Sequence, residues 1–378
     1  MADARLALII DGVEMRGWTQ VQVSRAITQA CSAFQVAMND SDDLRVRVNP
    51  GDACTVAFGG ETIINGHVDA VEINYTATSH DIAVSGRSRT ADLVDSWLDP
   101  VQYLGLGVVD IITRIAAQFG VSVSVVGDAS GVQMSTHQKK STDPEIEAFK
   151  ARFGIDEFAV QAKDGLAFEA IQDAAGRAGW YLSDTPEGNL VLSRTAGITT
   201  PNELIVMPGQ QVNVLAASYR DDQSSRYNTY RVIGQSASTD EHFGLDTAQI
   251  IAEVTDRDIG RNRLRVITAE TGLTTVQAEA RAIQERQAAI ASSFGIEYVV
   301  QGWTGSADEL WRENRLVNVR DDILGIRRQL LIDTVNYIQD LDGGTTCRLA
   351  LVLPEARLPV DASTVGVVGV SADMGYPQ

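Results

Sequence analysis

Short runs of alternating apolar and polar residues characterise the first part of the chain. Between residues 5 and 89, apolar side chains recur at every second position, as at Val21 and Val23 or Ile82 and Val84. The stretches NDSDD, NPGD and FGGE, rich in turn-forming residues, separate these runs. A period of two between turns predicts antiparallel strands with one buried face. We therefore expect residues 1–90 to form a first small antiparallel β-barrel domain.

The pattern changes after Arg89. Apolar residues take helical spacing in GVVDIITRIAAQFG, which starts at residue 107, and in GLAFEAIQDAAGRAG, which starts at residue 165. A strand-like run follows each helix, first VSVSVV and later WYLSD and LVLSR. Two helix-then-strand units predict a mixed α/β middle domain at residues 91–208. The polar, charged residues 135–154 between them predict an exposed loop.

The β pattern returns at residue 209. Strands are expected at 211–218, 227–233, 247–254, 263–268, 295–303, 315–320, 328–338 and 346–353. Residues 274–295 show helical spacing and predict a long amphipathic helix. We expect a second β-barrel domain at 209–358, with strands and this helix inserted at about 236–295, and a C-terminal arm at 359–378. The fold class is α+β, mainly β.

Two segments far apart in the chain resemble each other. Residues 68–84 read VDAVEINYTATSHDIAV, and residues 332–351 read IDTVNYIQDLDGGTTCRLAL. Each begins with a β-branched residue, Asp, a small residue and Val, continues through a Tyr and a polar turn, and resumes as an alternating strand. Chance similarity of two hairpins is the alternative. The shared order of features favours two related β domains in one chain.

Composition and charge limit the partners. The chain has 31 Lys and Arg against 50 Asp and Glu, a net charge of −19, which disfavours nonspecific attraction to phosphate or anionic lipid. Cys31, Cys54 and Cys347 lack CxxC spacing and are interpreted as core residues of a protein made in a reducing cytoplasm. The N-terminal apolar run breaks at Asp11, too early for a secretory or membrane-spanning segment.

The densest group of candidate site residues lies in the first of the two related segments. It consists of His67, Asp69, Glu72, His80 and Asp81. Such residues can hold a metal or act as acid and base. The second segment keeps Asp333 at the place of Asp69 but has Leu331 where the first has His67. A surface strand with ordinary polar residues is therefore the favoured interpretation.

Other candidates also have a structural explanation. Acidic pairs are typical of solvated turns or, less often, of a catalytic dyad; they are Asp42 with Asp43, Asp221 with Asp222, and Asp321 with Asp322. Asp256 and Asp258 resemble the start of a calcium loop that lacks its later positions. The basic group Arg257, Arg261, Arg263 and Arg265 fits internal salt bridges or an acidic partner. Trp303 and Trp311 fit a core or carbohydrate stacking. His137 and His242 are isolated. We predict no catalytic, cofactor-binding or metal-binding residues.

Several stretches resemble one protein family. GRSRTADLVDS at residues 86–96 and ELWRENRLVNV at residues 309–319 are fairly specific, and WTQVQVSRAITQACSAFQVAM and LLIDTVNYIQDLDGGTTCRLALVLP agree with them. Over nearly its whole length the chain resembles the baseplate hub proteins of Mu-like contractile-tailed bacteriophages, which are related to the late control protein D and type VI secretion spike hub families.

The resemblance implies a structural, non-enzymatic role without cofactors. It implies a homotrimer whose two related barrels per subunit form a pseudo-sixfold ring. Such a ring adapts the hexameric tail tube to the trimeric tail spike, contacts other baseplate proteins and passes DNA through a channel without specific binding. The protein is then expected in the virion, after assembly in the host cytoplasm. Two alternatives remain: the hub of a type VI secretion-like spike, disfavoured because no β-helical needle follows, and a cell-wall hydrolase using Asp69 or Asp321.

Overall fold

The computed structural model describes twelve stretches of the chain, and strands dominate them. These stretches are residues 6–39, 48–77, 80–99, 102–103, 106–126, 160–161, 165–177, 180–193, 198–209, 213–235, 249–268 and 275–357. The expected mainly β class is confirmed. The expected arm at 359–378 and loop at 135–154 lie outside the described residues, as do His137, His242, Asp42 and Asp43.

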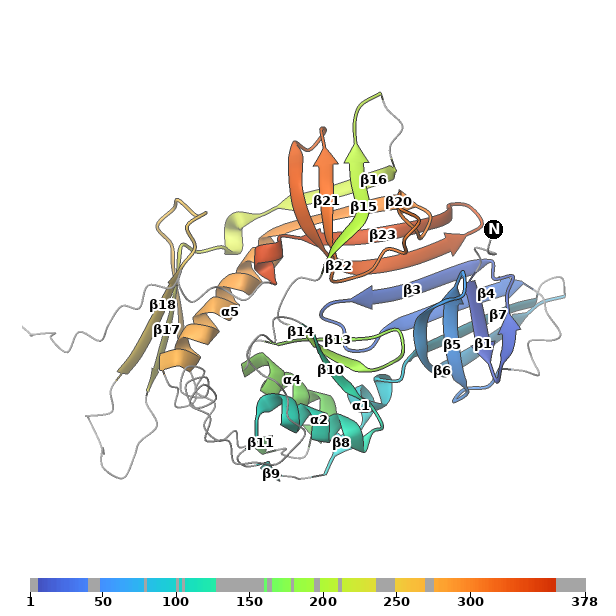
Figure 1. Cartoon of the computed structure of the whole chain (residues 1–378), viewed down its shortest axis with the longest axis horizontal. Helices are drawn as coiled ribbons and strands as arrows, with labels where there is room; N and C mark the ends of the chain where they lie inside the picture. The colour runs from blue at the N-terminus through green and yellow to red at the C-terminus, as the bar shows by residue number, and fades with distance from the viewer. Residues whose placement is uncertain are drawn as a thin grey trace, which may run out of the picture.

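Thirteen strands join into one large sheet (Figure 1). Its order is β16-β20-β23-β22-β3-β4-β7-β6-β5-β1-β2, and β21 and β15 extend it from β22. The N-terminal strands are β1 (Leu6–Ile10), β2 (Val13–Met15), β3 (Gln20–Ala26), β4 (Ala33–Asn39), β5 (Ala53–Phe58), β6 (Glu61–Tyr75) and β7 (His80–Ser88). The C-terminal strands are β15 (Thr199–Val206), β16 (Val214–Asp221), β20 (Phe294–Gln301), β21 (Leu316–Asp321), β22 (Ile326–Asp340) and β23 (Gly344–Val352).

The sheet contains two units with the same strand order. The N-terminal sheet unit runs β3-β4-β7-β6-β5-β1, and the C-terminal sheet unit runs β16-β20-β23-β22-β21-β15. In each unit, strands of six, fifteen and nine residues follow in succession, as β5, β6 and β7 or as β21, β22 and β23. The units differ at one end, where β1 pairs antiparallel with β5 but β15 pairs parallel with β21. The shared order and lengths support the duplication expected from the two related segments.

Asp69 and Asp333 occupy matching irregularities of the two fifteen-residue strands. The ladder with the next strand shifts by one residue at Asp69 in β6 and at Asp333 in β22. Each aspartate is therefore the extra residue of a β-bulge. Each carboxylate also holds an arginine, at 2.7 Å for Asp69 with Arg87 and at 3.0 Å for Asp333 with Arg357. The segments resemble each other because both build the same bulge.

The turn between β5 and β6 has the geometry that its glycine pair predicts. Phe58 pairs with Glu61, so Gly59 and Gly60 alone form the connection. Both glycines have positive φ, +59° and +87°. Such angles suit the tight hairpin turns whose twist matches that of the strands, and glycine adopts them without strain.

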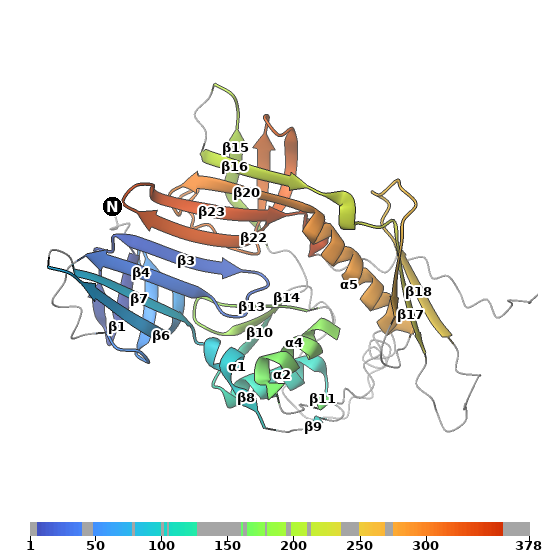
Figure 2. The ribbon, with the colours of Figure 1, turned by 180° about the vertical axis from the view of Figure 1, so that it is seen from behind.

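The two units join edge to edge through β3 and β22 (Figure 2). Val21–Ala26 of β3 pairs antiparallel with Thr334–Gln339 of β22. Val23 and Tyr337 lie directly opposite each other and are 0% and 1% exposed. We call this ladder the closed seam. A single hydrophobic cluster continues through both units, so the seam lies within one shared core.

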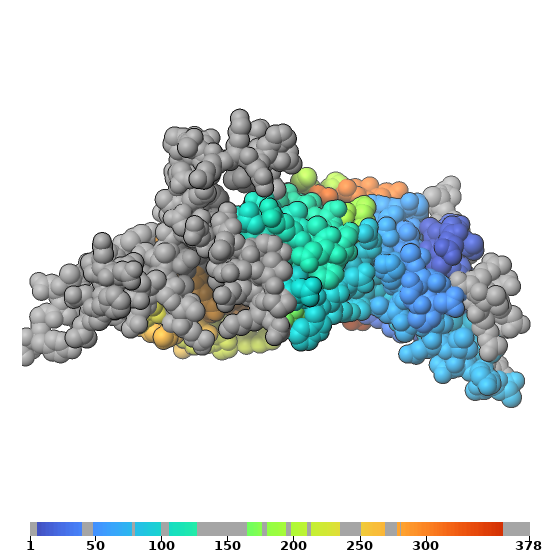
Figure 3. Space-filling model, turned by 90° about the horizontal axis from the view of Figure 1, so that it is seen from below, coloured from blue at the N-terminus to red at the C-terminus, as the bar shows by residue number. Residues whose placement is uncertain are grey.

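The middle region packs helices against a small sheet. Its helices are α1 (Ala91–Asp95), α2 (Val108–Gln118) and α4 (Ala167–Arg177). Its main strands are β10 (Val123–Val126), β13 (Tyr181–Asp184) and β14 (Leu190–Ser193), and the two-residue strands are β8 (Trp97–Leu98), β9 (Gln102–Tyr103), β11 (Val160–Gln161) and β12 (Gly165–Leu166). They enclose a second hydrophobic cluster. Figure 3 shows this region directly beside the N-terminal sheet unit.

A three-stranded sheet stands apart from the large one. It consists of β17 (Thr229–Gln235), β18 (Gln249–Thr255) and β19 (Leu264–Thr268), and the nineteen-residue α5 (Thr275–Ser293) packs on it. The helix leads directly into β20, which connects this sheet to the C-terminal sheet unit (Figure 1). Single 3₁₀ turns occur at Gln223–Ser225 and Pro354–Ala356. None of the described helices is long and apolar enough to cross a membrane.

Among the strands longer than three residues, one was not expected from the sequence. Residues 199–206 form β15, which pairs only with β21 among the described strands. Pro201 argues against a strand in the sequence, because proline cannot donate to a ladder. The register of β15 shifts between Thr199 and Glu203, around this proline, and no described strand pairs with its other edge. A proline is tolerated at an irregular edge strand.

Candidate functional site at the open strand edges

The candidate histidines and carboxylates are spread along the β6–β7 hairpin. His67 lies opposite Arg87, whereas His80 lies opposite Tyr75 at the far end. The eight residue steps of extended chain from His67 to Tyr75 correspond to about 26 Å at about 3.3 Å per step. In the described part of the chain, no three His, Cys, Asp or Glu residues are grouped so that they could hold a metal ion. The hairpin therefore fits the surface-strand interpretation.

Asp69 contributes to an ion-pair group that fastens α1 to the hairpin. Arg87 donates from Nε to Asp69 at 2.7 Å and from Nη2 to Asp95 of α1 at 2.6 Å. The hydrogen bond from Arg87 lowers the pKa of Asp95. All three side chains are at least one-third exposed, so the group positions the helix more than it stabilises the fold.

The acidic pairs organise turns. Asp321 is buried, and its Oδ1 accepts hydrogen bonds at 2.9 Å from the backbone N–H groups of residues 323 and 324. Its Oδ2 accepts the hydroxyl of Tyr298 at 3.0 Å. Asp222 accepts the backbone N–H of Ser224 at 2.9 Å. With both oxygens of Asp321 already bound, the turn interpretation is favoured over a catalytic dyad.

The calcium-like aspartates bind an arginine of their own chain. The buried Arg226 donates from Nε and Nη2 to Oδ2 of Asp256 at 3.0 and 2.7 Å. Asp258 is 3.4 Å from the same Nη2. The guanidinium thus occupies the position that a cation would take.

The basic group is also used locally. Arg263 donates to the backbone carbonyls of Gln223 and Ser224 at 3.1 and 2.7 Å. Its guanidinium carbon and that of Arg265 lie 4.7 and 5.8 Å from the ring centre of Tyr227. These contacts favour the structural interpretation of Arg263 and Arg265.

Both candidate tryptophans belong to the core. Trp303 and Trp311 are each 1% exposed. The indole N–H of Trp303 donates to the carbonyls of Ile338 and Thr346 at 3.0 Å, and the carbonyl of Trp311 accepts the hydroxyl of Tyr337. A buried indole offers no face to a sugar, so the core interpretation is confirmed.

The three cysteines are free thiols, and Cys54 and Cys347 are buried. Burial raises the pKa of all three thiols, to about 12 for Cys54. They are therefore poor nucleophiles and poor partners for disulfide formation at neutral pH.

A buried polar group at Arg25 joins three parts of the chain. Arg25 is 2% exposed and donates to the carboxylate of Glu313 at 2.8 and 3.0 Å. It also donates to the carbonyls of Ile63 and Asp184, both at 2.8 Å. The Asp184 carboxylate accepts the N–H and hydroxyl of Ser32 at 3.0 and 2.6 Å. We call these residues the Arg25 network; they connect both sheet units and the middle region.

The ionisation of the Arg25 network follows its geometry. Burial acts to raise the pKa of Glu313, but the charge and hydrogen bonds of Arg25 outweigh it, so the net pKa is lowered. For Asp184, burial dominates and raises the pKa. This network was not predicted from the sequence. Its only signal was the glutamate inside the ELWRENRLVNV stretch, since 288 residues separate Glu313 from Arg25.

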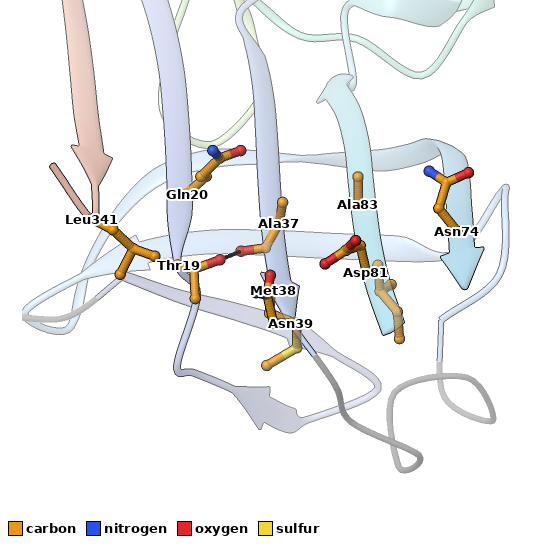
Figure 4. Close-up of a pocket in the computed structure, with 10 residues that line it drawn as sticks. Thr19, Gln20, Ala37, Met38, Asn39, Asn74, Asp81, Ala83 and Leu341 are labelled. Carbon is orange, nitrogen blue, oxygen red and sulfur yellow. Dashed lines mark hydrogen bonds between the residues drawn. The ribbon is translucent and has the colours of Figure 1, made fainter. Parts of the chain in front are cut away.

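A hollow of about 300 Å³ lies over β3, β4 and β7 (Figure 4). Thr19, Ala37 and Asn74 line it together with Leu341 from the β22–β23 turn, and the hydroxyl of Thr19 is bound to the carbonyl of Ala37 at 3.1 Å. Asp81 is the one ionisable residue in its lining. This lining offers little for catalysis.

Two open strand edges are the strongest candidates for a functional surface. β16 pairs only with β20 among the described strands, and seven of its eight residues are exposed. The second open edge is the end of β6, Ala70–Tyr75, which pairs with β7 on one side only, because β5 pairs with Glu61–His67. Its last four residues are exposed. Exposed edges invite pairing with another strand.

Family models match the two ends of the chain. Residues 5–88 match "Mu phage baseplate assembly protein GpP-like, N-terminal", and residues 274–360 match "Mu phage baseplate assembly protein GpP, fourth domain". The first matched region covers the whole N-terminal sheet unit, and the second covers the β20–β23 part of the C-terminal one.

Individual relatives extend the similarity to almost the full chain. Baseplate hub protein gp44 of Escherichia phage Mu is 29% identical over 367 residues, 94% of this chain and 90% of that protein. The 43 kDa tail protein of prophage MuSo2 from Shewanella oneidensis is 28% identical, with a TM-score of 0.75 over 93% of this chain and 99% of that one. A tail protein from Neisseria meningitidis MC58 shares the fold, with 17% identity, a TM-score of 0.74 and coverage of 94% and 99%. At 29% identity, this chain is a relative of the Mu protein and not that protein itself.

Proposed function

We propose that this chain, which is similar to Mu-like baseplate hub proteins over almost its full length, forms a homotrimeric ring at the centre of a phage tail baseplate. The ring joins the hexameric tail tube on one face to the trimeric tail spike on the other, and contacts other baseplate proteins at its rim. It functions as a structural component of the virion, after assembly in the host cytoplasm, without a cofactor or catalytic site.

The observation that carries the proposal is the repeated strand order of the two sheet units. A threefold ring of chains with two similar units each presents six similar units around its axis. Such a ring offers quasi-sixfold contacts to a hexamer while keeping true threefold symmetry for a trimer. The duplication thereby solves the symmetry mismatch between tube and spike.

The domain organisation of the proposal follows the sequence analysis with one adjustment. We propose barrel-like first and second β domains at 1–90 and 209–358, a middle domain at 91–208 and an arm at 359–378. Because β15 pairs with β21, we place the boundary between the middle domain and the second β domain before Thr199 instead of at residue 208.

The acidic character of the chain suits a channel. With a net charge of −19, a ring of these chains repels DNA phosphates and lets DNA slide without specific binding. A trimer structure with a channel lined by Lys and Arg would contradict this part of the proposal.

The alternatives are less favoured. A type VI secretion spike hub shares the lineage, but the relatives with 29% and 28% identity are named as phage proteins. A cell-wall hydrolase would need Asp69 or Asp321 as an available carboxylate, and both are bound by neighbouring groups.

Electron micrographs of the purified protein test the proposed function. Averaged particle images viewed along the axis should show a closed threefold ring with six similar lobes around an opening. Single-chain particles or open filaments would contradict it.

A further inference from the structure

The closed seam provides a template for a second seam. Within the chain, the edge strand of the N-terminal sheet unit, β3, pairs with the second half of the long strand of the C-terminal sheet unit, β22. In the other unit, the strand equivalent to β3 is β16, the edge of the C-terminal sheet unit. The strand segment equivalent to the second half of β22 is the second half of β6. Both of these have an open edge in the described structure. Repetition of the closed seam would therefore join β16 to β6.

The ladders of the two units fix the residue correspondence. The bulges align Asp69 with Asp333, so Ala70–Tyr75 corresponds to Thr334–Gln339. The ladders that lead from β7 through β4 to β3 correspond to those that lead from β23 through β20 to β16. These registers align Val23 with Tyr219. Val21–Arg25 of β3 consequently corresponds to Ala217–Asp221 of β16.

We propose that β16 of one copy pairs antiparallel with Ala70–Tyr75 of a second copy, in the register of the closed seam. The inference rests on the proposed ring and specifies its contact between subunits. In this register Tyr219 lies opposite Ile73, Arg220 opposite Glu72, and Ser218 opposite Asn74. We call this contact the open seam.

The side chains of the open seam complement each other in this register. Tyr219 and Ile73 are 42% and 37% exposed, and they correspond to Val23 and Tyr337, which are buried in the closed seam. Arg220 meets a carboxylate of opposite charge. The third pair, Ser218 with Asn74, is polar on both sides. Apolar and opposite-charge pairs directly across a ladder are the stabilising kinds.

A second copy is the partner that the geometry favours. Each chain carries one edge of each kind, so a head-to-tail contact uses every edge when the ring closes. The closed and open seams then alternate around the ring. A different protein that paired with β16 would need a strand edge like the end of β6, which a second copy of this chain already has.

Disulfide trapping tests the open seam in the full-length protein. A chain carrying Asn74→Cys and Ser218→Cys has both thiols opposite each other across the seam, so mild oxidation should give a covalent trimer on a non-reducing gel. The matched control carries Glu72→Cys and Ser218→Cys, where the Cα atoms are displaced to about 7–8 Å, at or beyond the reach of a disulfide. The first variant should give about tenfold more covalent trimer than the control. The wild type should give none, because two of its three thiols are buried and all three have raised pKa values.

The possible outcomes distinguish failure of the open seam from failure of the proposed trimeric ring. Cross-linking as strong in the displaced pair as in the opposite pair would overturn the register. No cross-linking in a protein whose light-scattering mass is still that of three chains would overturn the open seam and leave the proposed function standing. A single-chain mass for the wild type would overturn both.

Discussion

The guanidinium of Arg25 and the carboxylate of Glu313 lie 2.8 Å apart in the protein interior, with 288 residues between them in the sequence. Arg25 belongs to the N-terminal sheet unit, and Glu313 precedes β21 of the C-terminal one. The two units are therefore fixed by a buried ion pair in addition to the closed seam. The proposed ring, which adapts sixfold to threefold symmetry, needs such a fixed arrangement of its two units.

Removing the arginine should destabilise the fold strongly. In Arg25→Ala, the Glu313 carboxylate stays buried without its partner, and we expect the free energy of unfolding to fall by about 3–5 kcal/mol. Chemical denaturation measures it. The control is Arg16→Ala, whose arginine pairs with Glu14 at the surface and should cost under about 1 kcal/mol. Equal losses for the two variants would contradict a central role of the network.

Acid should weaken the fold partly through Glu313. Because its pKa is lowered in the folded state, its contribution is fully present above the unfolded value, about pH 4.3, and is lost as the pH falls through the lower folded value. Glu313→Gln lacks this contribution. We expect its free energy of unfolding to fall less steeply below about pH 4.3 than that of the wild type. Parallel curves in acid denaturation would show that Arg25 does not hold this carboxylate ionised.

A charge placed on the open seam should break the ring and spare the fold. In Tyr219→Asp, an unpaired carboxylate would face Ile73 inside the contact, so subunit association should weaken about 10- to 100-fold. Sedimentation at graded concentrations measures it, and circular dichroism should be unchanged. Ile323→Asp is the control, because Ile323 is 71% exposed and belongs to the β21–β22 turn, which is part of neither open edge. Intact association in Tyr219→Asp would place the contact elsewhere.

Exchanging the charges of Glu72 and Arg220 should restore the subunit association that each single change weakens. Glu72→Arg or Arg220→Glu sets like charges opposite each other, and we expect each to weaken association about fivefold at low salt. The double variant restores an opposite-charge pair and should recover most of the affinity. If the two losses simply add in the double variant, the residues do not face each other.

The regular strands and helices could be predicted because alternation and helical spacing are local signals. The hairpin turn at Gly59 and Gly60 and the helices α2 and α4 appear where the sequence placed them. The similarity of VDAV to IDTV indicated a repeat, and the structure adds its physical reason, an aspartate-containing bulge in both copies. The strand at β15 was missed because Pro201 is a local signal against a strand, and only tertiary pairing with β21 overrides it.

The open strand edges and the Arg25 network could not be predicted from the sequence for a different reason. Histidines and acidic pairs drew attention as isolated residue types, but their neighbours in space, such as Arg87 for Asp69, decide their role. The Arg25 network depends on contacts between distant segments. An open strand edge is visible only once every other ladder is known. Pairing partners, more than residue types, therefore locate the functional surface.

The solution mass of the intact protein tests the central claim most directly. One chain has a mass of 40.8 kDa, so a closed ring of three has three times that mass, about 122 kDa. Multi-angle light scattering across a range of concentrations should give this value and no larger species, because a closed ring pairs β16 and the end of β6 in every chain. A single-chain mass at high concentration, or a mass that keeps growing with concentration, would contradict the account.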